Sequence, residues 1–323
     1  PLYTLLAKAS IGAFGVSEWA LRLPALFGAA IFLWSLWRIL QREFKDSWWT
    51  PLGMALVALN PYMLDFFVAA RGYGLGCGFL LAGIDAVLAG RIAWAGVAMG
   101  LAFATNLTFA FPAAATSIAI VLIGRSLKPG FLHAALWLSI GAAIEYGPVR
   151  NATSEHFYFG VDTLRETAAT LVRVTFFHHT LGEIREIERI GAVIAGIALL
   201  VGIWIGIRDQ GRLTRLLGGI CASCIALLIA AHLIAGVRYP LFRTALYWLP
   251  LWSLLMLACA RRAGRLAAVP LAILAWWFAA QWKADYFHEW TFCANTREIA
   301  QTIERSRRGG GRVTVVATWP LVS

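Results

Sequence analysis

Long apolar runs, separated by short gaps rich in Arg and Gly, make up most of the sequence. A membrane-spanning helix needs about 20 mostly apolar residues, and runs near this length recur along most of the chain. Because several runs are short, the fourth and fifth could form one re-entrant unit. The pattern predicts an all-α polytopic membrane protein with about ten transmembrane helices, near residues 23–40, 51–69, 74–90, 92–106, 108–124, 131–147, 190–207, 216–236, 245–260 and 267–283.

Two segments outside these runs predict helices on the membrane surface. Residues 1–22 are amphipathic rather than uniformly apolar, so we expect a short interfacial helix before the first span. The one long gap, 148–189, contains Leu164, Ala168 and Leu171 at helical spacing, which predicts an amphipathic helix lying on the membrane.

The character of the sequence changes after Lys283. The stretch "TREIAQTIERSRR" is typical of a solvated helix, "GGG" of a turn and "RVTVVAT" of a buried strand. We therefore expect two domains: a transmembrane domain over 1–283, and the start of a small soluble α/β unit, on the outer face, over 284–323.

The positions of Lys and Arg predict the orientation of the spans. Short cytoplasmic loops of membrane proteins are enriched in these residues. If the first span runs from the outside to the cytoplasm, the gaps rich in Lys and Arg are cytoplasmic, and both ends of the chain lie outside the cytoplasm. These gaps contain Arg38, Arg42, Lys45, Arg91, Arg125, Lys128, Arg208, Arg212, Arg215, Arg261, Arg262 and Arg265.

Composition agrees with a membrane protein. Hydrophobic residues make up 60% of the chain and charged residues 14%, whereas a soluble domain is about 25% charged. The net charge of +11 does not indicate nucleic-acid binding, because the basic residues lie in gaps between apolar runs rather than on a soluble face. Cys221 and Cys224 form a CxxC inside an apolar run, which favours small buried residues over a redox pair.

Candidate binding residues lie in the predicted outer gaps. The stretch "MLDFFVAARGYGLGCGFLL" places Asp65, Arg71 and Tyr73 between two apolar runs, and Arg238 and Arg243 lie in a later outer gap. Arginines in outer loops run against the usual enrichment of Lys and Arg in cytoplasmic loops. Since the planar guanidinium binds phosphate oxygens in a bidentate way, they indicate an anionic ligand such as a phosphate. Contact with lipid headgroups, or ion pairing with Asp65 or a loop Glu, is the alternative.

Other ionisable residues carry weaker signals. His178 and His179 lack the spacing of a metal site, so we assign no metal ligands. Asp85 and Glu145 fall within apolar runs, where pairing with a neighbouring helix is the expected role and a proton path the alternative. The glycines of "RGYGLGCG" do not fit a dinucleotide loop and predict close packing between membrane helices.

Three separated segments together resemble the GT-C superfamily of membrane glycosyltransferases, which includes protein mannosyltransferases and the lipid A aminoarabinose transferase. These segments are "PLYTLLAKASIGAFGVSEWALRLPALFG", "NPYMLDFFVAARGYGLGCGFLL" and "RYPLFRTALYWLPLW". The resemblance covers most of residues 1–283. It implies an enzyme of the bacterial inner membrane with its active site on the periplasmic face.

The resemblance implies transfer of a sugar from a polyprenyl-phosphate carrier to a lipid, glycan or protein acceptor. In such enzymes an acid in the first outer loop acts as base on the acceptor hydroxyl, and cations stabilise the phosphate leaving group. Arg71 and Arg243 occupy the family's arginine positions. Tyr73 would hydrogen-bond the phosphate or sugar, and Asp65 would orient Arg71 or serve as a second acid.

The sequence departs from the family in two ways. It begins at Pro1 inside the element that follows the first loop, so we expect the first helix and the catalytic acid to lie upstream, and this chain alone to be inactive. Ala69 stands where many members have an acid or amide, which leaves the cofactor open, a divalent cation included. A transporter or lipid flippase using Asp85, Arg91 and Glu145, and a non-catalytic membrane scaffold, are the alternative functions.

Overall fold

The computed structural model describes residues 1–45, 47–151, 160–177, 185–209, 211–282 and 305 of the 323-residue chain. The chain divides into two compact units, Pro1–Gln281 and Trp282–Ser323. The described part of the first unit is helical and contains no β-strand. The predicted α/β unit over 284–323 lies outside the described residues, apart from Arg305, and stays a prediction.

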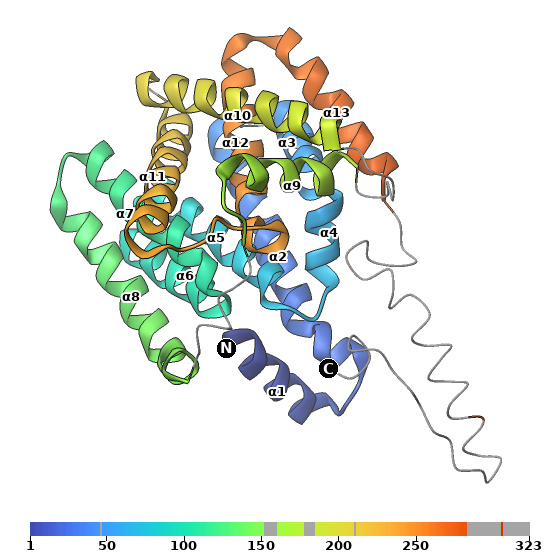
Figure 1. Cartoon of the computed structure of the whole chain (residues 1–323), viewed down its shortest axis with the longest axis vertical. Coiled ribbons are helices and arrows are strands. Elements are labelled where there is room, and N and C mark those ends of the chain that lie inside the picture. The colour runs from blue at the N-terminus through green and yellow to red at the C-terminus, as the bar shows by residue number, and fades with distance from the viewer. Residues whose placement is uncertain (46, 152–159, 178–184, 210, 283–304, 306–323) are drawn as a thin grey trace. The chain divides into compact units, whose positions relative to one another are not determined.

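Helices lie in each of the ten apolar ranges (Figure 1). Their bounds are α1 Leu2–Phe14, α2 Glu18–Phe44, α3 Trp49–Ala58, α4 Pro61–Val68, α5 Gly72–Leu88, α6 Ile92–Thr105, η1 Leu107–Phe109, α7 Ala110–Gly124, α8 Leu127–Arg150, α9 Leu164–Phe176, α10 Arg185–Arg208, α11 Arg212–Ala235, η3 Phe242–Ala245, α12 Trp248–Ala263, η4 Arg265–Ala267 and α13 Ala268–Ala280.

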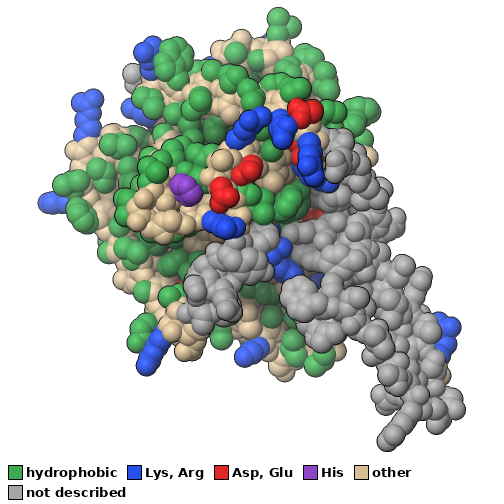
Figure 2. All heavy atoms as spheres, viewed as in Figure 1, with side chains coloured by type: hydrophobic (Ala, Val, Ile, Leu, Met, Phe, Trp, Pro, Cys, Tyr) green, Lys and Arg blue, Asp and Glu red, His purple; other side chains and the backbone are tan. Residues whose placement is uncertain are grey.

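Five helical segments of the described chain are long and apolar enough to cross a membrane: α2, η1 with α7, α8, α10 and α11. The bent pair α3–α4 would make a sixth, while α5, α6 and α13 are shorter apolar helices. The predicted all-helical membrane fold is thus confirmed, whereas the number of ten spans is not. Hydrophobic side chains cover much of the face in Figure 2, as contact with lipid requires.

The predicted span over 51–69 is broken at Asn60. The axes of α3 and α4 differ by 65°. The side-chain oxygen of Asn60 accepts hydrogen bonds from the amides of Tyr62 and Met63, and Pro61 occupies the first turn of α4. An Asn cap followed by Pro is a strong start signal for a helix, so this dipeptide begins a new helix instead of continuing the old one.

The helix expected before the first span is present as α1. Tyr3 and Ser10 are buried on one side of it, and their hydroxyls donate to the carbonyls of Leu21 and Ala20 in α2, at 2.8 and 2.6 Å. Burial raises the pKa of Tyr3 to about 12, so its hydroxyl stays protonated as the donor. These bonds dock α1 against the beginning of α2.

Glycines allow α2 and α5 to pack at backbone contact. A Cβ on Gly28 would overlap the backbone of Leu75, and a Cβ on Gly78 would overlap the backbone of Gly28. The predicted small-residue packing of α5 is therefore observed, although its glycines face several partners. Gly74 lies against Phe66 of α4, and Gly72 against Thr105 of α6. This packing fixes the start of α5, where Arg71 and Tyr73 are located.

Charged side chains tie the helices together at the end predicted to be cytoplasmic. Asp85 of α5 forms ion pairs with Arg38 and Arg42 of α2, at 3.0 and 2.9 Å. Arg262 at the end of α12 forms an ion pair with Asp209, which follows α10. The expected pairing of Asp85 with a neighbouring helix is confirmed, since both of its ionic partners belong to α2.

Candidate functional site

The segments predicted to face outward contact one another. Gly72 packs against the carbonyl oxygen of Thr105, which links the start of α5 to the end of α6. Val161 and Tyr239 form an antiparallel bridge with backbone hydrogen bonds of 3.0 and 2.9 Å. We call this surface the loop end of the molecule. It is formed by residues 65–74, 105–109, 160–176 and 238–247.

Asp65, Arg71 and Tyr73 lie at the junction of α4 and α5. Asp65 is 9% exposed on α4, whereas Arg71 is exposed and immediately precedes α5. The Tyr73 ring is 9% exposed and packs edge-to-face on Phe66 of α4, with 5.3 Å between ring centroids. The two apolar runs thus hold Tyr73 firmly, while Arg71 reaches solvent or the membrane surface.

Arg243 lies in the turn η3, whose backbone is strained. The preceding residue, Phe242, has φ of 47°, a left-handed conformation that aromatic residues rarely adopt. The Thr244 hydroxyl accepts a hydrogen bond from the Leu241 amide at 2.7 Å and stabilises this turn. Such strain persists only where surrounding contacts impose it, and it is frequent at binding sites.

A packing chain connects the segments of Arg71 and Arg243. Gly76, one turn into α5, lies against the ring of Phe109 in η1. The Phe109 ring contacts that of Tyr247, just after η3, with 6.0 Å between centroids. The two arginines predicted to bind phosphate therefore belong to segments that this packing chain joins. Their direct role with a ligand stays a prediction.

Arg238 occupies a more peripheral position. Its Nε lies 3.9 Å from Oδ1 of Asp162, and both side chains are more than half exposed. A pair at this distance and exposure contributes little to stability. Arg238 therefore retains most of its capacity to bind an anion, although it lies at the rim of the loop end.

Helix α9 connects the parts of the loop end. Its first turn has a capping box, in which the Thr163 hydroxyl and Glu166 carboxylate satisfy each other's backbone amides. At its other end, Trp277 of α13 donates to the carbonyl of Phe176 at 3.0 Å. The helix packs against α4, α10 and η3, so it contacts the elements that carry Asp65 and Arg243. Its placement on the membrane surface stays a prediction.

An apolar cavity of about 490 Å³ lies beneath α9. Its walls come from α9, α10, α11 and α12, and hydrocarbon groups supply nearly all of its accessible surface. Representative lining residues are Ala168, Leu171, Gly196, Leu199, Trp248 and Trp252. The cavity therefore adjoins the same helix that contacts the turn of Arg243, and it fits an apolar chain better than a sugar.

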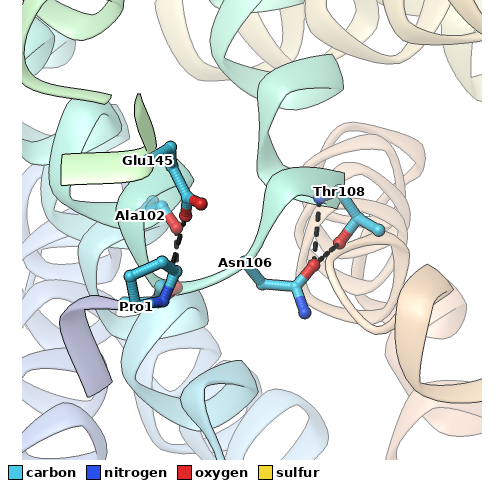
Figure 3. A network of polar contacts seen from close by, with 6 residues as sticks. Pro1, Ala102, Asn106, Thr108 and Glu145 are labelled. Atoms are coloured by element: carbon cyan, nitrogen blue, oxygen red, sulfur yellow. Dashed lines mark hydrogen bonds and ion pairs between the residues drawn. The ribbon is translucent and has the colours of Figure 1, made fainter. Parts of the chain in front are cut away.

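A buried acid lies near the ends of α6 and α8. Glu145 is 3% exposed, and its Oε1 is 4.0 Å from the nitrogen of Pro1. Figure 3 shows it beside Pro1 and Ala102, with Asn106 on the following turn. Asn106 accepts hydrogen bonds from the amide and hydroxyl of Thr108 at 3.0 and 2.8 Å. The carboxylate of Glu145 thus lies beside the N-cap residue of another helix, α1.

No metal site is formed by the part of the chain that the structure describes, where no three His, Cys, Asp or Glu side chains converge. His178 and His179 lie outside the described residues. Cys221 and Cys224 are both buried thiols, in agreement with their predicted packing role. The loop end therefore offers guanidinium groups and apolar surface as its main binding features.

Sequence reasoning missed the cavity and the strain at Phe242. The cavity depends on α9 packing across two distant helices, which no local pattern specifies. Its sequence signal is the row of small residues Ala192, Ala195 and Gly196 on α10, facing Trp248 and Trp252 of α12. A left-handed conformation at a Phe has no signal in the sequence, because the residue type disfavours it.

Comparison with known proteins gives the fold. The sequence matches no known family profile and no characterised protein. The structure is similar to the crystal structure of ArnT from Cupriavidus metallidurans in the apo state, with a TM-score of 0.51 and 17% sequence identity. The similarity covers 81% of this chain and 49% of ArnT, so the chain spans about half the length of that protein. The chain therefore shares the fold of that crystal structure over most of its length, and its long apolar helices are those of an integral membrane protein.

Proposed function

We propose that this chain is part of a glycosyltransferase that takes a sugar from a polyprenyl-phosphate carrier. The observation that carries the proposal is the apolar cavity beneath α9, at the same end of the molecule as Arg71 and Arg243. A polyprenyl phosphate has a long hydrocarbon chain and an anionic headgroup, and these two features match the cavity and the arginines. The fold of the GT-C kind supports the same reaction class.

The arginines would act on the phosphate. A guanidinium binds two phosphate oxygens at once, and it is less strongly hydrated than an ammonium group. Cleavage of the glycosyl–phosphate bond leaves negative charge on the lipid phosphate. Cations already held in place near that oxygen stabilise the transition state more than the ground state. Arg71 and Arg243 take this role in the proposal, with Tyr73 and Arg238 as further contacts.

The acceptor would be a lipid, glycan or protein whose hydroxyl loses its proton to a carboxylate. Asp65, on α4, is the candidate second acid or the group that orients Arg71. The proposed site faces the periplasm of a bacterial inner membrane. A divalent cation remains a candidate cofactor, although the described residues suggest no ligand set for it.

A proton or substrate path through Asp85 gains no support. Both ionic partners of Asp85 are arginines of α2, an arrangement that holds two helices together. We therefore prefer the transferase function to a transporter that uses Asp85.

Binding of decaprenyl phosphate to the purified chain in nanodiscs tests the proposal. Decaprenol, which has the same hydrocarbon chain and no charge, is the matched ligand. Because charge-assisted hydrogen bonds contribute about 1.5–3 kcal/mol each, we expect the phosphate to bind at least tenfold more tightly. Equal binding of the two lipids would refute phosphate recognition at this site.

A further inference from the structure

The ends of four helices meet at the surface opposite the loop end. Glu43, in the last turn of α2, lies near the backbone of Leu213 and near Arg212, both in the first turn of α11. Arg262 of α12 pairs with Asp209, which follows α10 and whose side chain is 8% exposed. We call this region the four-helix junction. Residues far apart in the sequence build it, so it is not a simple basic loop.

Cations outnumber acids at the four-helix junction. Its described residues include five arginines that have no role in the Asp85 cluster, against the two carboxylates of Glu43 and Asp209, which leaves a surplus of three positive charges. Most of these guanidinium groups are on exposed residues. The five are Arg208, Arg212, Arg215, Arg261 and Arg262. Figure 2 shows Lys and Arg side chains at the edge of the molecule where α10 ends.

Tryptophans and aliphatic side chains adjoin these arginines. The guanidinium of Arg208 lies over the Trp204 ring, 4.4 Å from its centroid, and that of Arg261 is 6.0 Å from the centroid of Trp49. Trp204 is 55% and Ile207 62% exposed, so both present apolar surface beside the charges. Trp next to Arg at a helix end is typical of the depth where lipid headgroups meet hydrocarbon.

We infer that the four-helix junction binds the headgroup of an anionic phospholipid. The phosphate would contact Arg212 and Arg208, while the acyl chains would lie along the exposed apolar surface of α10. A soluble phosphate has no use for that apolar surface, and a zwitterionic lipid carries a cation that the surplus positive charge repels. Basic pockets between membrane helices are suited to such lipids. The inference is independent of the reaction at the loop end.

Native mass spectrometry of the full chain, extracted from vesicles of phosphatidylglycerol and phosphatidylcholine in equal amounts, tests the inference. Wild type should retain phosphatidylglycerol in preference. Each guanidinium near an anionic membrane surface changes affinity about fivefold, so Arg208→Ala with Arg212→Ala should lower retention about 25-fold. Neither substitution breaks the Arg262–Asp209 ion pair, and Arg42 and Arg262 remain near Glu43 when Arg212 is removed, so the junction should keep its fold.

Arg91→Ala with Lys128→Ala is the matched control. It removes the same charge from the same predicted side, next to α6 and α8, which pack mainly with each other, α5 and α7. Retention in this control should equal that of wild type. The inference is wrong if the control loses as much lipid as the junction variant, if both lipids are retained equally, or if inorganic phosphate displaces the lipid.

A second double variant keeps both positive charges and changes only the geometry of the cationic groups. Arg208→Lys with Arg212→Lys retains the charge and loses bidentate geometry, so retention should fall less than in the alanine variant. Thermal melting of all variants in the same detergent checks their folding. Retention that follows melting temperature instead of charge would overturn the inference.

Discussion

The carboxylate of Asp85 in α5 lies 3.0 Å from the Nε of Arg38 in α2, and this contact joins the two helices. A second arginine, Arg42, reaches the other carboxylate oxygen at 2.9 Å and also donates to the Asp85 carbonyl. Asp85 is 8% exposed, so water cannot replace these partners fully. The cluster fixes α2 against α5 at the end of the molecule opposite Arg71.

Asp85→Asn should destabilise the protein by roughly 2 kcal/mol. The value lies between that of an exposed ion pair and that of a fully buried one, because the two arginines are about one-third exposed. Thermal unfolding in detergent measures it. Asp162→Asn, which removes the exposed partner of Arg238, is the control and should leave the melting temperature unchanged. Equal effects of the two substitutions would contradict the assigned role of Asp85.

Arg71→Ala should abolish sugar transfer while membrane insertion remains intact. The assay uses a labelled polyprenyl-phosphate sugar and the full-length protein in membrane vesicles. Arg71→Lys retains charge but loses the bidentate fork, so it should keep partial activity. Arg243→Ala should act in the same direction. If transfer survived Arg71→Ala, the phosphate-binding role of this residue would be wrong.

Gly28→Ala should destabilise the contact between α2 and α5. Its new methyl group would overlap the Leu75 backbone, which cannot move as a flexible side chain can, so we expect a loss of about 1–3 kcal/mol. Gly12→Ala, on α1, is the matched control because nothing lies within 4 Å of its Cβ position. That substitution should be neutral or stabilise the helix by roughly 0.5–1 kcal/mol. Unfolding midpoints of both variants provide the comparison.

Ser117→Ala should destabilise the packing of α7 on α8. The Ser117 hydroxyl lies 2.7 Å from Nδ1 of the fully buried His133 and accepts a hydrogen bond from Nε1 of Trp137 at 3.1 Å. Its removal leaves two buried groups unpaired, at a cost of about 1–3 kcal/mol.

Thr116→Val is the control for Ser117→Ala. Among the described residues, the Thr116 hydroxyl bonds only to the Pro112 carbonyl one turn earlier in α7, so its loss should cost clearly less than that of Ser117. Urea or thermal unfolding of the two variants decides between a structural network and an incidental contact. A larger effect at Thr116 would contradict the network.

Local patterns predicted the helices well, whereas the roles of the chosen site residues stay predictions. Apolar runs placed a helix at every expected range, because lipid leaves the backbone no alternative partner. The bend at Asn60 was missed although Asn–Pro encodes it, since hydropathy alone joined α3 to α4. The loop-end residues were chosen from charge. Their assembly depends on contacts such as Phe109 with Tyr247, which periodicity does not reveal.

The bridge between Val161 and Tyr239 has a consequence for how the chain can vary. Between these two residues the chain forms α9, α10 and α11, and it then returns to the position of Val161. The two backbone hydrogen bonds close this excursion into a loop with joined ends. Lengthening such a loop costs little additional entropy. Since α10 and α11 pack against α7, α9 and α12, we expect changes in length between these helices rather than within them, while the ends that carry Asp162 and Arg238 stay in register.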